Sequence, residues 1–445
     1  MRRHWVLGVA SVPVLATGLF VAHFALRPRP VAPAAAAASS TAIESPPALV
    51  HPERVPADDD APAAEPPTLA GLDLAHIAFD DSGAFAPADQ GTARLTVDPE
   101  LQRIVTGILS AHHFPEASVV LMDVATGRLL AYASHVEGHP ARDLCVEATA
   151  PSASVFKIVT AAALVEEAHV GPETKRCYSG GEQRIGASDL VDDPQRDRWC
   201  TTLAGAMGRS INTVFARLAK EDLTPQKLES MARRFGYGRP MPFDVPVQPS
   251  GLHVPAEPLE FARTAAGFWN TTLSPIGAVE LSAIVARGGE TVRPSIVEKL
   301  VSTSGAVAWT APESPAPRRA ISKETADQVG AMMERTVSDG TCFRAFHDLR
   351  GTAYLPGIVV AGKTGTLTEA ESHRYYTWFT GFAPAHPQGD IPQVAVAALV
   401  VNGPNWLLKA NVVARETLRA YFATRGAQGV TRPSTEAVAR HRKKH

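Results

Sequence analysis

The stretch from Pro151 to Lys157 carries a hydroxyl and an amine at a spacing that suits nucleophilic chemistry. Proline and serine favour a helix start, so Ser154 is predicted at or just inside the N-terminus of a helix that continues through the apolar residues 158–164. One helical turn separates Ser154 from Lys157, which places both side chains on one face. Burial disfavours the ammonium form of a lysine, so a neutral Lys157 could act as the base for the Ser154 hydroxyl.

This S-x-x-K pattern is not specific on its own, because a chain of 445 residues should contain about one by chance. The alternative interpretation is a helix cap at Ser154 and a solvated surface charge at Lys157. Other residues must decide between the two interpretations.

A second pattern consists of Ser210 and Asn212, at a break between two predicted helices. Ser210 could relay a proton or hydrogen-bond to Lys157, and Asn212 offers an amide to a substrate peptide group.

A third pattern, Lys363-Thr364-Gly365-Thr366, lies at the end of an apolar strand. Lys363 supplies a second cation, which would lower the pKa of the first lysine and attract a substrate carboxylate. Thr364 and Thr366 can hydrogen-bond that carboxylate, and Gly365 allows a close approach of the backbone. The backbone N–H groups of Ser154 and Thr366 are predicted to form an oxyanion hole. Each pattern alone would indicate a turn or a cap, but chance explains all three in this order poorly.

Alternating and β-branched segments predict a hairpin early in the domain and three strands late in it, and these could share one antiparallel sheet. The predicted strands are Ala117–Met122, Leu129–Ser134, Ile358–Thr366, Tyr375–Phe382 and Val394–Val401. A mainly helical block lies between them, with a further strand at Val292–Val301 and its possible partner at Val307–Thr310. The last predicted helix is Leu407–Ala423. The fold class is therefore α+β: an antiparallel sheet of about five strands packed against helices, plus a helix-rich subdomain, with the active site between them.

The chain divides into five predicted regions. Residues 1–27 are a cytoplasmic tip and a transmembrane anchor, because the apolar run 5–26 is long enough to cross a bilayer and follows a basic N-terminus. Cleavage within residues 34–38 is the alternative. Residues 28–68 form a Pro/Ala-rich linker, residues 69–92 an unassigned lead-in, and residues 93–424 the main domain. Residues 425–445 are a basic disordered tail.

The net charge and the cysteine spacing limit which kinds of partner, metal site and cellular compartment are expected. The formal net charge is -2, which gives no reason to expect a nucleic-acid partner. The four cysteines, at 145, 177, 200 and 342, show no C-x-x-C spacing, so zinc and thioredoxin-like sites are not indicated. Cys177 and Cys200 flank one loop-like region. They would form a disulfide if the domain is exported, or remain two ordinary buried thiols.

Together, the three patterns resemble those of the transpeptidase domain of penicillin-binding proteins, in the superfamily of serine β-lactamases and D,D-peptidases. The segments Leu95–Asp98, Val120–Gly127 and Tyr376–Pro384 also look like parts of that domain. The resemblance covers about residues 93–424. No glycosyltransferase domain is expected, and residues 69–92 are too few for the large N-terminal module of division-type members.

The resemblance implies an acyl-enzyme on Ser154, formed from D-Ala-D-Ala stem peptides of peptidoglycan and resolved by a neighbouring amine as a cross-link. Lys157 and Ser210 would assist catalysis, and Asn212 with Lys363, Thr364, Gly365 and Thr366 would bind substrate. β-Lactams would be inhibitors, and neither a metal nor an organic cofactor is needed. The domain would lie outside the bacterial cytoplasmic membrane, in the periplasm, beside other proteins of cell-wall synthesis. The alternatives are a D,D-carboxypeptidase, a β-lactamase or β-lactam sensor, and a non-catalytic scaffold.

Overall fold

The computed structural model describes residues 69–181, 184–369, 373–387, 389–404 and 408–433. The expected anchor at residues 5–26, the linker, and the end of the tail from residue 434 lie outside these residues. Within the described ranges, no helix is both long enough and apolar enough to cross a membrane.

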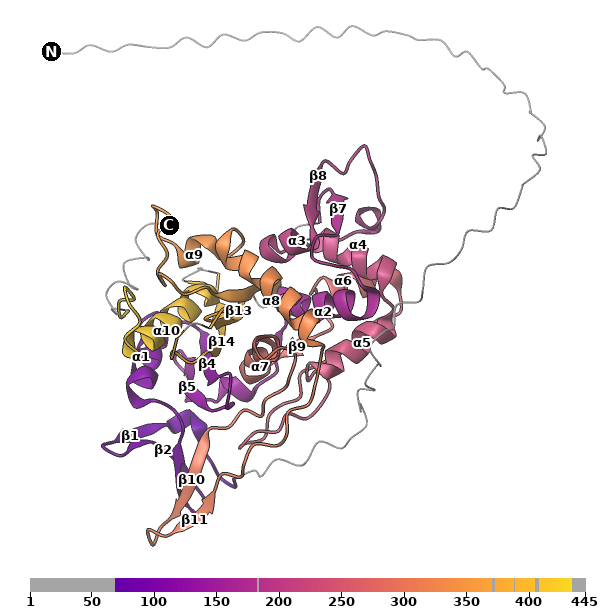
Figure 1. Cartoon of the computed structure of the whole chain (residues 1–445). Helices are drawn as coiled ribbons and strands as arrows, with labels where there is room; N and C mark the ends of the chain where they lie inside the picture. Colours follow the sequence, from indigo (N-terminus) through magenta and orange to yellow (C-terminus); the bar gives the residue numbers. More distant parts are fainter. Residues whose placement is uncertain (1–68, 182–183, 370–372, 388, 405–407, 434–445) are drawn as a thin grey trace, which may run out of the picture. The chain divides into compact units, whose positions relative to one another are not determined.

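A five-stranded antiparallel sheet, in the order β12-β13-β14-β4-β5, forms the centre of the domain (Figure 1). Its strands come from two distant parts of the chain: β4 (Glu116–Asp123), β5 (Leu129–Val136), β12 (Ala361–Glu369), β13 (Arg374–Ala383) and β14 (Val394–Asn402). The two parts meet where β14 pairs with β4, from Val394 opposite Asp123 to Val401 opposite Glu116. The prediction that an early hairpin and three late strands share one sheet is confirmed.

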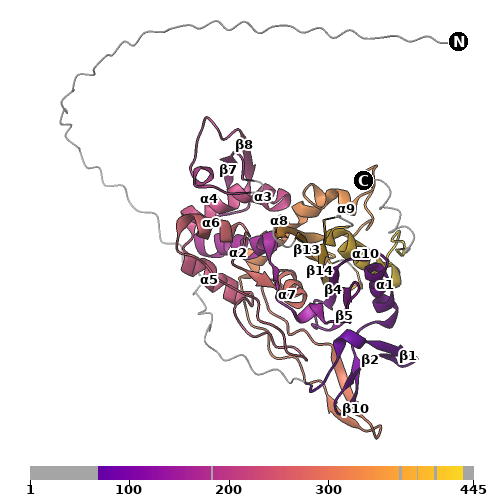
Figure 2. The same ribbon diagram turned by 180° about the vertical axis from the view of Figure 1, so that it is seen from behind.

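Helices cover both faces of this sheet, which explains why every residue of β14 is buried. Successive residues of a strand point to opposite faces, so Val394 and Val396 join one apolar core while Ala395 and Ala397 join the other. Helices α1 and α10 cover the first face, α7 and α8 cover the second, and α2 packs against α8 (Figures 1 and 2). Their bounds are Pro99–Ser110 for α1, Lys157–Ala168 for α2, Pro275–Ala286 for α7, Lys323–Ser338 for α8 and Ala410–Thr424 for α10.

The predicted helix-rich part is built around α2, which packs against α4 and α5. Its helices are α3 (Leu203–Arg209), α4 (Asn212–Asp222), α5 (Pro225–Arg234) and α6 (Pro258–Ala265). Short elements connect it to the rest: η1 (Leu74–His76), η2 (Leu144–Val146), β6 (Ala150–Pro151), η3 (Ala153–Phe156), η4 (Ala187–Leu190), β9 (Thr272–Leu273) and α9 (Phe343–Phe346).

A small lobe projects beyond α3 and α4 at the top of Figure 1. It contains the paired strands β7 (Lys175–Tyr178) and β8 (Trp199–Thr202), joined by a disulfide between Cys177 and Cys200. The lobe is anchored by Arg217 of α4, whose guanidinium donates to the Cys177 carbonyl at 2.9 Å and to the Asp197 carboxylate at 2.6 Å. Of the two alternatives that the sequence left open for these cysteines, the structure contains the disulfide.

A second five-stranded sheet, in the order β1-β2-β3-β10-β11, uses the residues that the sequence left unassigned. Its strands are β1 (Ala78–Asp80), β2 (Gly83–Ala88), β3 (Gly91–Leu95), β10 (Val297–Ser302) and β11 (Val307–Thr310). The predicted pairing of the last two is confirmed, but the strand expected from Val292 begins only at Val297. Just before and at this start, the carboxylate of Asp244 accepts the N–H groups of Ile296 and Val297 at 2.7 and 2.9 Å.

Two other predicted elements begin later in the structure than expected. The strand expected from Ile358 begins at Ala361, because the N–H of Ile358 is held in a turn by the carbonyl of Leu355. The helix expected from residue 407 begins at Ala410, because Lys409 has an extended backbone. Both differences shorten the start of an element, where local sequence is least informative.

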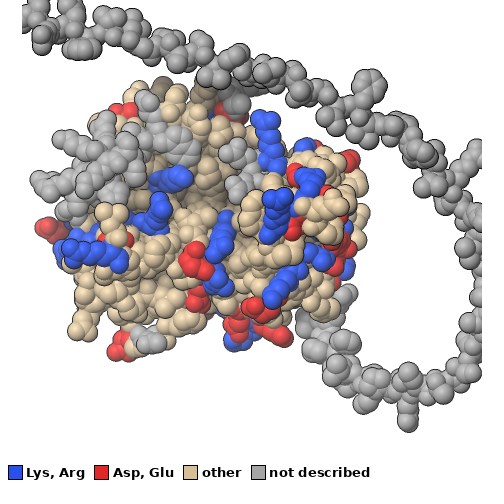
Figure 3. Space-filling view, turned by 90° about the horizontal axis from the view of Figure 1, so that it is seen from above, with Lys and Arg blue, Asp and Glu red and all other residues tan. Residues whose placement is uncertain are grey.

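The face seen from above carries charges of both signs (Figure 3). Lys and Arg side chains lie at several separate places on it, with Asp and Glu between them. This mixture agrees with the near balance of 43 basic and 45 acidic residues in the whole chain. Such a surface produces no extended field of one sign on this face.

Replacement of Asp244 should destabilise the protein strongly. Asp244 and Arg293 form a buried pair, 2.7 Å apart, with side chains 1% and 6% exposed. Asp244→Ala leaves a buried guanidinium and two N–H groups without their acceptor, so the free energy of unfolding should fall by about 3–5 kcal/mol. Urea unfolding followed by circular dichroism measures this loss. Asp327→Ala, which removes an exposed partner of Lys323, is the matched control and should leave the midpoint nearly unchanged. Equal midpoints for the two variants would contradict the structural role of Asp244.

Candidate active site

Ser154 and Lys157 lie where a short 3-10 turn becomes a helix. Ser154 belongs to η3, and Lys157 is the first residue of α2. The sequence therefore predicted the position of Ser154 correctly, although the turn that carries it is 3-10 rather than α. The Nζ of Lys157 and the Oγ of Ser154 are 2.7 Å apart. This is a distance across which a proton can be transferred.

The amine of Lys157 is held by three oxygen atoms. Besides Ser154, it donates to the Asn212 Oδ1 at 2.7 Å and to the carbonyl of Ala266 at 2.5 Å. An ammonium has three donors, so each has an acceptor and the nitrogen is fixed in one place. The carbonyl of Ala266 is a part of the site that the sequence missed. A backbone acceptor gives no signal in the residue types.

Lys157 is completely buried and has no carboxylate among these three partners. Burial lowers the pKa of Lys157 well below its ordinary value, and the positive charge of Lys363 lowers it further. The predicted effect of the second cation is thus present. A lysine in this environment can be neutral at a pH at which an exposed lysine is charged, as a general base requires.

Ser210 and Lys363 form a second contact of the site. Ser210 ends α3 in a left-handed conformation, with φ of 57°, and its Oγ accepts a hydrogen bond from the Lys363 Nζ at 2.9 Å. The side chain of Lys363 is completely buried, which lowers its pKa to about 7. The sequence suggested that Ser210 would hydrogen-bond to Lys157. The structure instead places Asn212 on Lys157 and Ser210 on Lys363.

The edge strand β12 brings the third pattern alongside the turn that carries Ser154. A Cβ added to Gly365 would lie 3.1 Å from the Ala153 Cβ and 3.3 Å from the Ser152 carbonyl. A side chain at this position would press on the turn of Ser154, so glycine suits the close approach of strand and turn. Thr366 is exposed, and Thr364 is partly exposed with its hydroxyl 2.7 Å from that of Thr341.

The turn that carries Ser154 is supported by buried polar contacts that the sequence did not reveal. Ser152 accepts a hydrogen bond from the Tyr237 hydroxyl at 3.1 Å, and Trp378 donates through Nε1 to the carbonyl of Pro151 at 2.9 Å. Ala153 has a left-handed backbone, with φ of 50°. Its carbonyl oxygen packs so closely on Gly267 that a Cβ added to Gly267 would lie only 2.3 Å from it. Three separate segments thus determine the position of the turn. No short motif connects them in the sequence.

The structure therefore brings six of the eight predicted site residues into two adjoining groups and places the other two next to them on β12. Ser154, Lys157 and Asn212 form the first group, through the amine of Lys157. Ser210, Lys363 and Thr364 form the second, through the amine of Lys363, which also donates to the Thr364 carbonyl at 2.9 Å. Gly365 and Thr366 continue β12 past the turn of Ser154.

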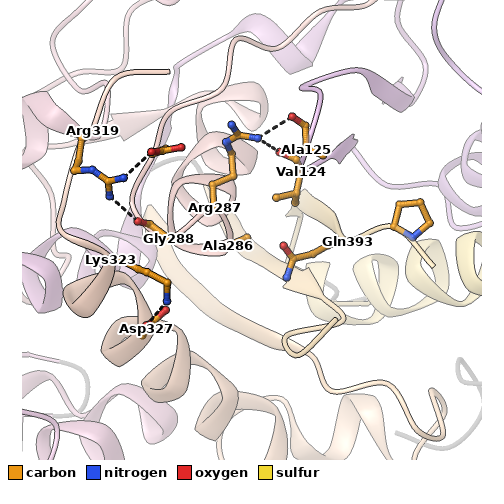
Figure 4. A pocket seen from close by; sticks show the side chains of 11 residues that line it. Val124, Ala125, Ala286, Arg287, Gly288, Arg319, Lys323, Asp327 and Gln393 are labelled. Atoms are coloured by element: carbon orange, nitrogen blue, oxygen red, sulfur yellow. Dashed lines mark hydrogen bonds and ion pairs between the residues drawn. The ribbon is translucent and has the colours of Figure 1, made fainter. Parts of the chain in front are cut away.

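A separate cavity of about 570 Å³ contains none of these residues (Figure 4). Arg287 donates there to the carbonyls of Val124 and Ala125, at 2.7 and 2.8 Å, and Lys323 pairs with Asp327. The contacts of Arg287 join the turn between β4 and β5 to the end of α7, whereas the pair of Lys323 and Asp327 lies within α8. Because Arg287 and Lys323 already have partners within the protein, we interpret this cavity as a structural junction.

The comparison with protein families identifies the class of this domain. The sequence model of the penicillin binding protein transpeptidase domain matches residues 117–420, so the chain belongs to this family. Stage V sporulation protein D of Bacillus subtilis is 28% identical over 343 residues, which cover 71% of this chain and 51% of that protein. The chain thus spans about half the length of that relative. Peptidoglycan D,D-transpeptidase PbpA of Mycobacterium tuberculosis is 27% identical over 391 residues, 77% of this chain and 74% of the relative.

Solved structures support the same assignment of the fold. The D,D-transpeptidase domain of a peptidoglycan glycosyltransferase from Eggerthella lenta is 25% identical, with a TM-score of 0.61 and coverage of 75% of this chain and 83% of that chain. The imipenem acyl-enzyme complex of penicillin-binding protein A from M. tuberculosis is 24% identical, with a TM-score of 0.57 and coverage of 74% and 80%. The predicted α+β class and the predicted family are confirmed.

The rate of acylation by a carboxylate-bearing acyl donor should depend on pH through both lysines. A base must be neutral, so the rate constant should rise with pH as Lys157 loses its proton. A carboxylate-binding Lys363 must be charged, so the rate should fall as pH rises through about 7, the pKa of Lys363. The second-order acylation constant of the free enzyme, measured over a pH range that extends well to both sides of the Lys363 pKa, gives this profile.

Lys363→Arg is the matched variant for this profile, because a guanidinium keeps its charge throughout the measured range. The acylation constant of this variant should no longer decrease as the pH rises above about 7, the pKa of Lys363, whatever the absolute size of the constant. An unchanged decrease in Lys363→Arg would show that another group titrates there.

Proposed function

We propose that this protein is a membrane-anchored D,D-transpeptidase that cross-links peptidoglycan stem peptides and is inhibited by β-lactams. The observation that carries the proposal is the 2.7 Å contact between the Ser154 Oγ and the buried amine of Lys157, whose pKa is lowered. Membership in the transpeptidase family and the names of the relatives support the same reaction class. The reaction needs neither a metal nor an organic cofactor.

The proposed first step is acylation of Ser154. The neutral amine of Lys157 takes the hydroxyl proton while the Oγ attacks the carbonyl between the two D-alanines. The C–N bond then breaks, and the departing D-Ala amine receives a proton from the ammonium of Lys157. Ser210, whose hydroxyl is held by Lys363, is proposed to hydrogen-bond to the departing amine while Lys157 supplies the proton. The product is an ester between Ser154 and the shortened stem peptide.

The proposed second step releases the ester. The amine of a neighbouring stem peptide attacks the ester carbonyl and loses a proton to Lys157, which returns it to the Ser154 oxygen as the ester bond breaks. The result is a new peptide bond between two stems. Water in place of the amine would give D,D-carboxypeptidase activity through the same groups.

Substrate would be held along β12. The carboxylate of the terminal D-Ala would lie near the cation of Lys363 and the hydroxyls of Thr364 and Thr366. The N–H groups of Ser154 and Thr366 are the proposed oxyanion hole, which is supported by the position of edge strand β12 alongside η3. Asn212 is proposed to face the peptide group of the substrate while it fixes Lys157.

Two alternatives gain less support from the structure. A β-lactamase needs a base that activates water against the acyl-enzyme. Glu166, further along α2, instead accepts hydrogen bonds from Ser322 and Thr325 at the start of α8. A non-catalytic scaffold would not need the two buried lysines at their hydroxyl partners, since buried unpaired amines destabilise a fold.

The proposed location is outside the bacterial cytoplasmic membrane, in the periplasm, with residues 5–26 as a single-pass anchor. The disulfide between Cys177 and Cys200 supports an oxidising compartment, because such bonds are rare in the cytosol. Its two residues lie on the surface of the lobe, where cytosolic reductants would reach them. Peptidoglycan stems and other cell-wall synthesis proteins are the proposed partners.

Fluorescent penicillin should label the purified protein covalently at Ser154. Ser154→Ala should abolish the label completely, because no other hydroxyl replaces the nucleophile. Ser110→Ala is the control and should keep the label, since Ser110 is exposed at the end of α1 and its hydroxyl donates to the carbonyl of Thr106. Gel fluorescence and mass spectrometry of the labelled peptide provide the measurement.

The outcomes separate the alternatives. A long-lived adduct on Ser154 supports the transpeptidase or carboxypeptidase, and product analysis with a stem peptide and an acceptor amine then distinguishes the two. Rapid turnover of nitrocefin would support a β-lactamase. A folded protein that forms no adduct would favour the scaffold and overturn the proposed enzyme.

A further inference from the structure

The turn between α8 and α9 connects the second and third sequence patterns of the site. The backbone N–H of Thr341 donates to the carbonyl of Gly208, two residues before Ser210, at 3.0 Å. The side-chain Oγ1 of the same Thr341 lies 2.7 Å from the Oγ1 of Thr364. One residue outside all three patterns therefore contacts the end of α3 and the strand β12.

Close packing keeps this turn in place. A Cβ on Gly340 would lie 2.1 Å from the carbonyl oxygen of Gly208, and one on Gly208 would lie 2.9 Å from the Arg335 Cβ. Arg335 in turn pairs with Asp339 at 2.6 Å. With two glycines in contact and an ion pair at its start, the turn has little freedom to move Thr341 away from Thr364.

The contact between the two threonines lies where a ligand can reach it. Thr341 is exposed and lines a cavity of about 460 Å³ with Ser338, Asp339, Gly340, Phe343 and Arg344. Thr364 is partly exposed and adjoins Lys363 in sequence. Its hydroxyl is therefore accessible both to Thr341 and to a ligand bound beside the Lys363 cation.

Each threonine hydroxyl has one proton to donate. If Thr364 donates its proton to a substrate carboxylate, its oxygen can still accept the proton of Thr341. The chain then runs from Thr341 to Thr364 to the carboxylate, and each hydrogen bond polarises the next. In the absence of Thr341, the Thr364 hydroxyl could also rotate to donate elsewhere.

We infer that Thr341 is a positioning residue that directs the Thr364 hydroxyl toward the carboxylate of the acyl donor. It acts on recognition of the carboxylate through Thr364 and leaves the chemistry at Ser154 to other groups. The inference rests on the proposed function, because that function gives Thr364 a carboxylate to bind. It adds a residue for donor specificity on a segment outside the three patterns.

The test compares two acyl donors, benzylpenicillin and its methyl ester, which differ in the charge of the carboxyl group and by one methyl group. Thr341→Val keeps the shape of the side chain but removes the hydroxyl. It should lower the second-order acylation constant for the free acid about 3- to 10-fold, the effect expected from one lost hydrogen bond. The constant for the ester should change much less, because its uncharged carbonyl accepts a weaker hydrogen bond from Thr364 than a carboxylate does. Thr341→Ser restores the hydroxyl and should recover most of the rate with the free acid.

A second variant makes the assignment to Thr364 testable. In Thr364→Val the hydroxyl that Thr341 is proposed to orient is gone, so adding Thr341→Val should cause no further loss. Equal losses for the acid and the ester in Thr341→Val would indicate a merely structural role and overturn the inference, as would no loss for either donor. Unmodified protein that forms no adduct on Ser154 would overturn the proposed function instead, so the two failures can be told apart.

Discussion

The site depends on one costly arrangement, a lysine amine buried without a carboxylate partner. Moving an ammonium out of water is unfavourable, and Lys157 is surrounded by three neutral oxygens with a second cation nearby. The fold therefore favours the neutral amine, which is the form that can accept the proton of Ser154. A carboxylate in the same place would stabilise the charged form and remove the base.

The surrounding architecture can be understood as the support for this arrangement. Lys157 at the start of α2 must reach Asn212 at the start of α4, and Lys363 of the edge strand β12 must reach Ser210 at the end of α3. The central sheet is covered by helices on both faces, which makes β12 a rigid edge against which η3 can pack. The contact of Gly365 with Ala153 fixes the separation between the strand and the turn of Ser154. Rigidity here keeps the nucleophile and the carboxylate-binding groups in one geometry.

The two lysines have different hydrogen-bond partners and therefore different proposed roles. Lys157 is held by Ser154 and Asn212, whereas Lys363 is held by Ser210 and by the carbonyl of its neighbour Thr364. Burial and the charge of the other lysine both disfavour the ammonium form of each. A substrate carboxylate would stabilise the charged form of Lys363. Binding of an acidic acyl donor and activation of the serine are in this way parts of the same electrostatic balance.

The sequence by itself determined the three patterns, the central sheet and the helix that follows Ser154, because these depend on local periodicity and on residue types with specific chemistry. It could not assign residues 69–92, since their strands are completed by β10, about two hundred residues later. It also suggested Ser210 as the partner of Lys157, whereas the structure gives that place to Asn212, only two residues away. Which of them reaches which lysine is decided by the left-handed backbone at Ser210 and by the packing of α3 against α8. The carbonyl of Ala266 and the hydroxyl of Thr341 were likewise beyond the sequence, because long-range packing alone brings them to the site.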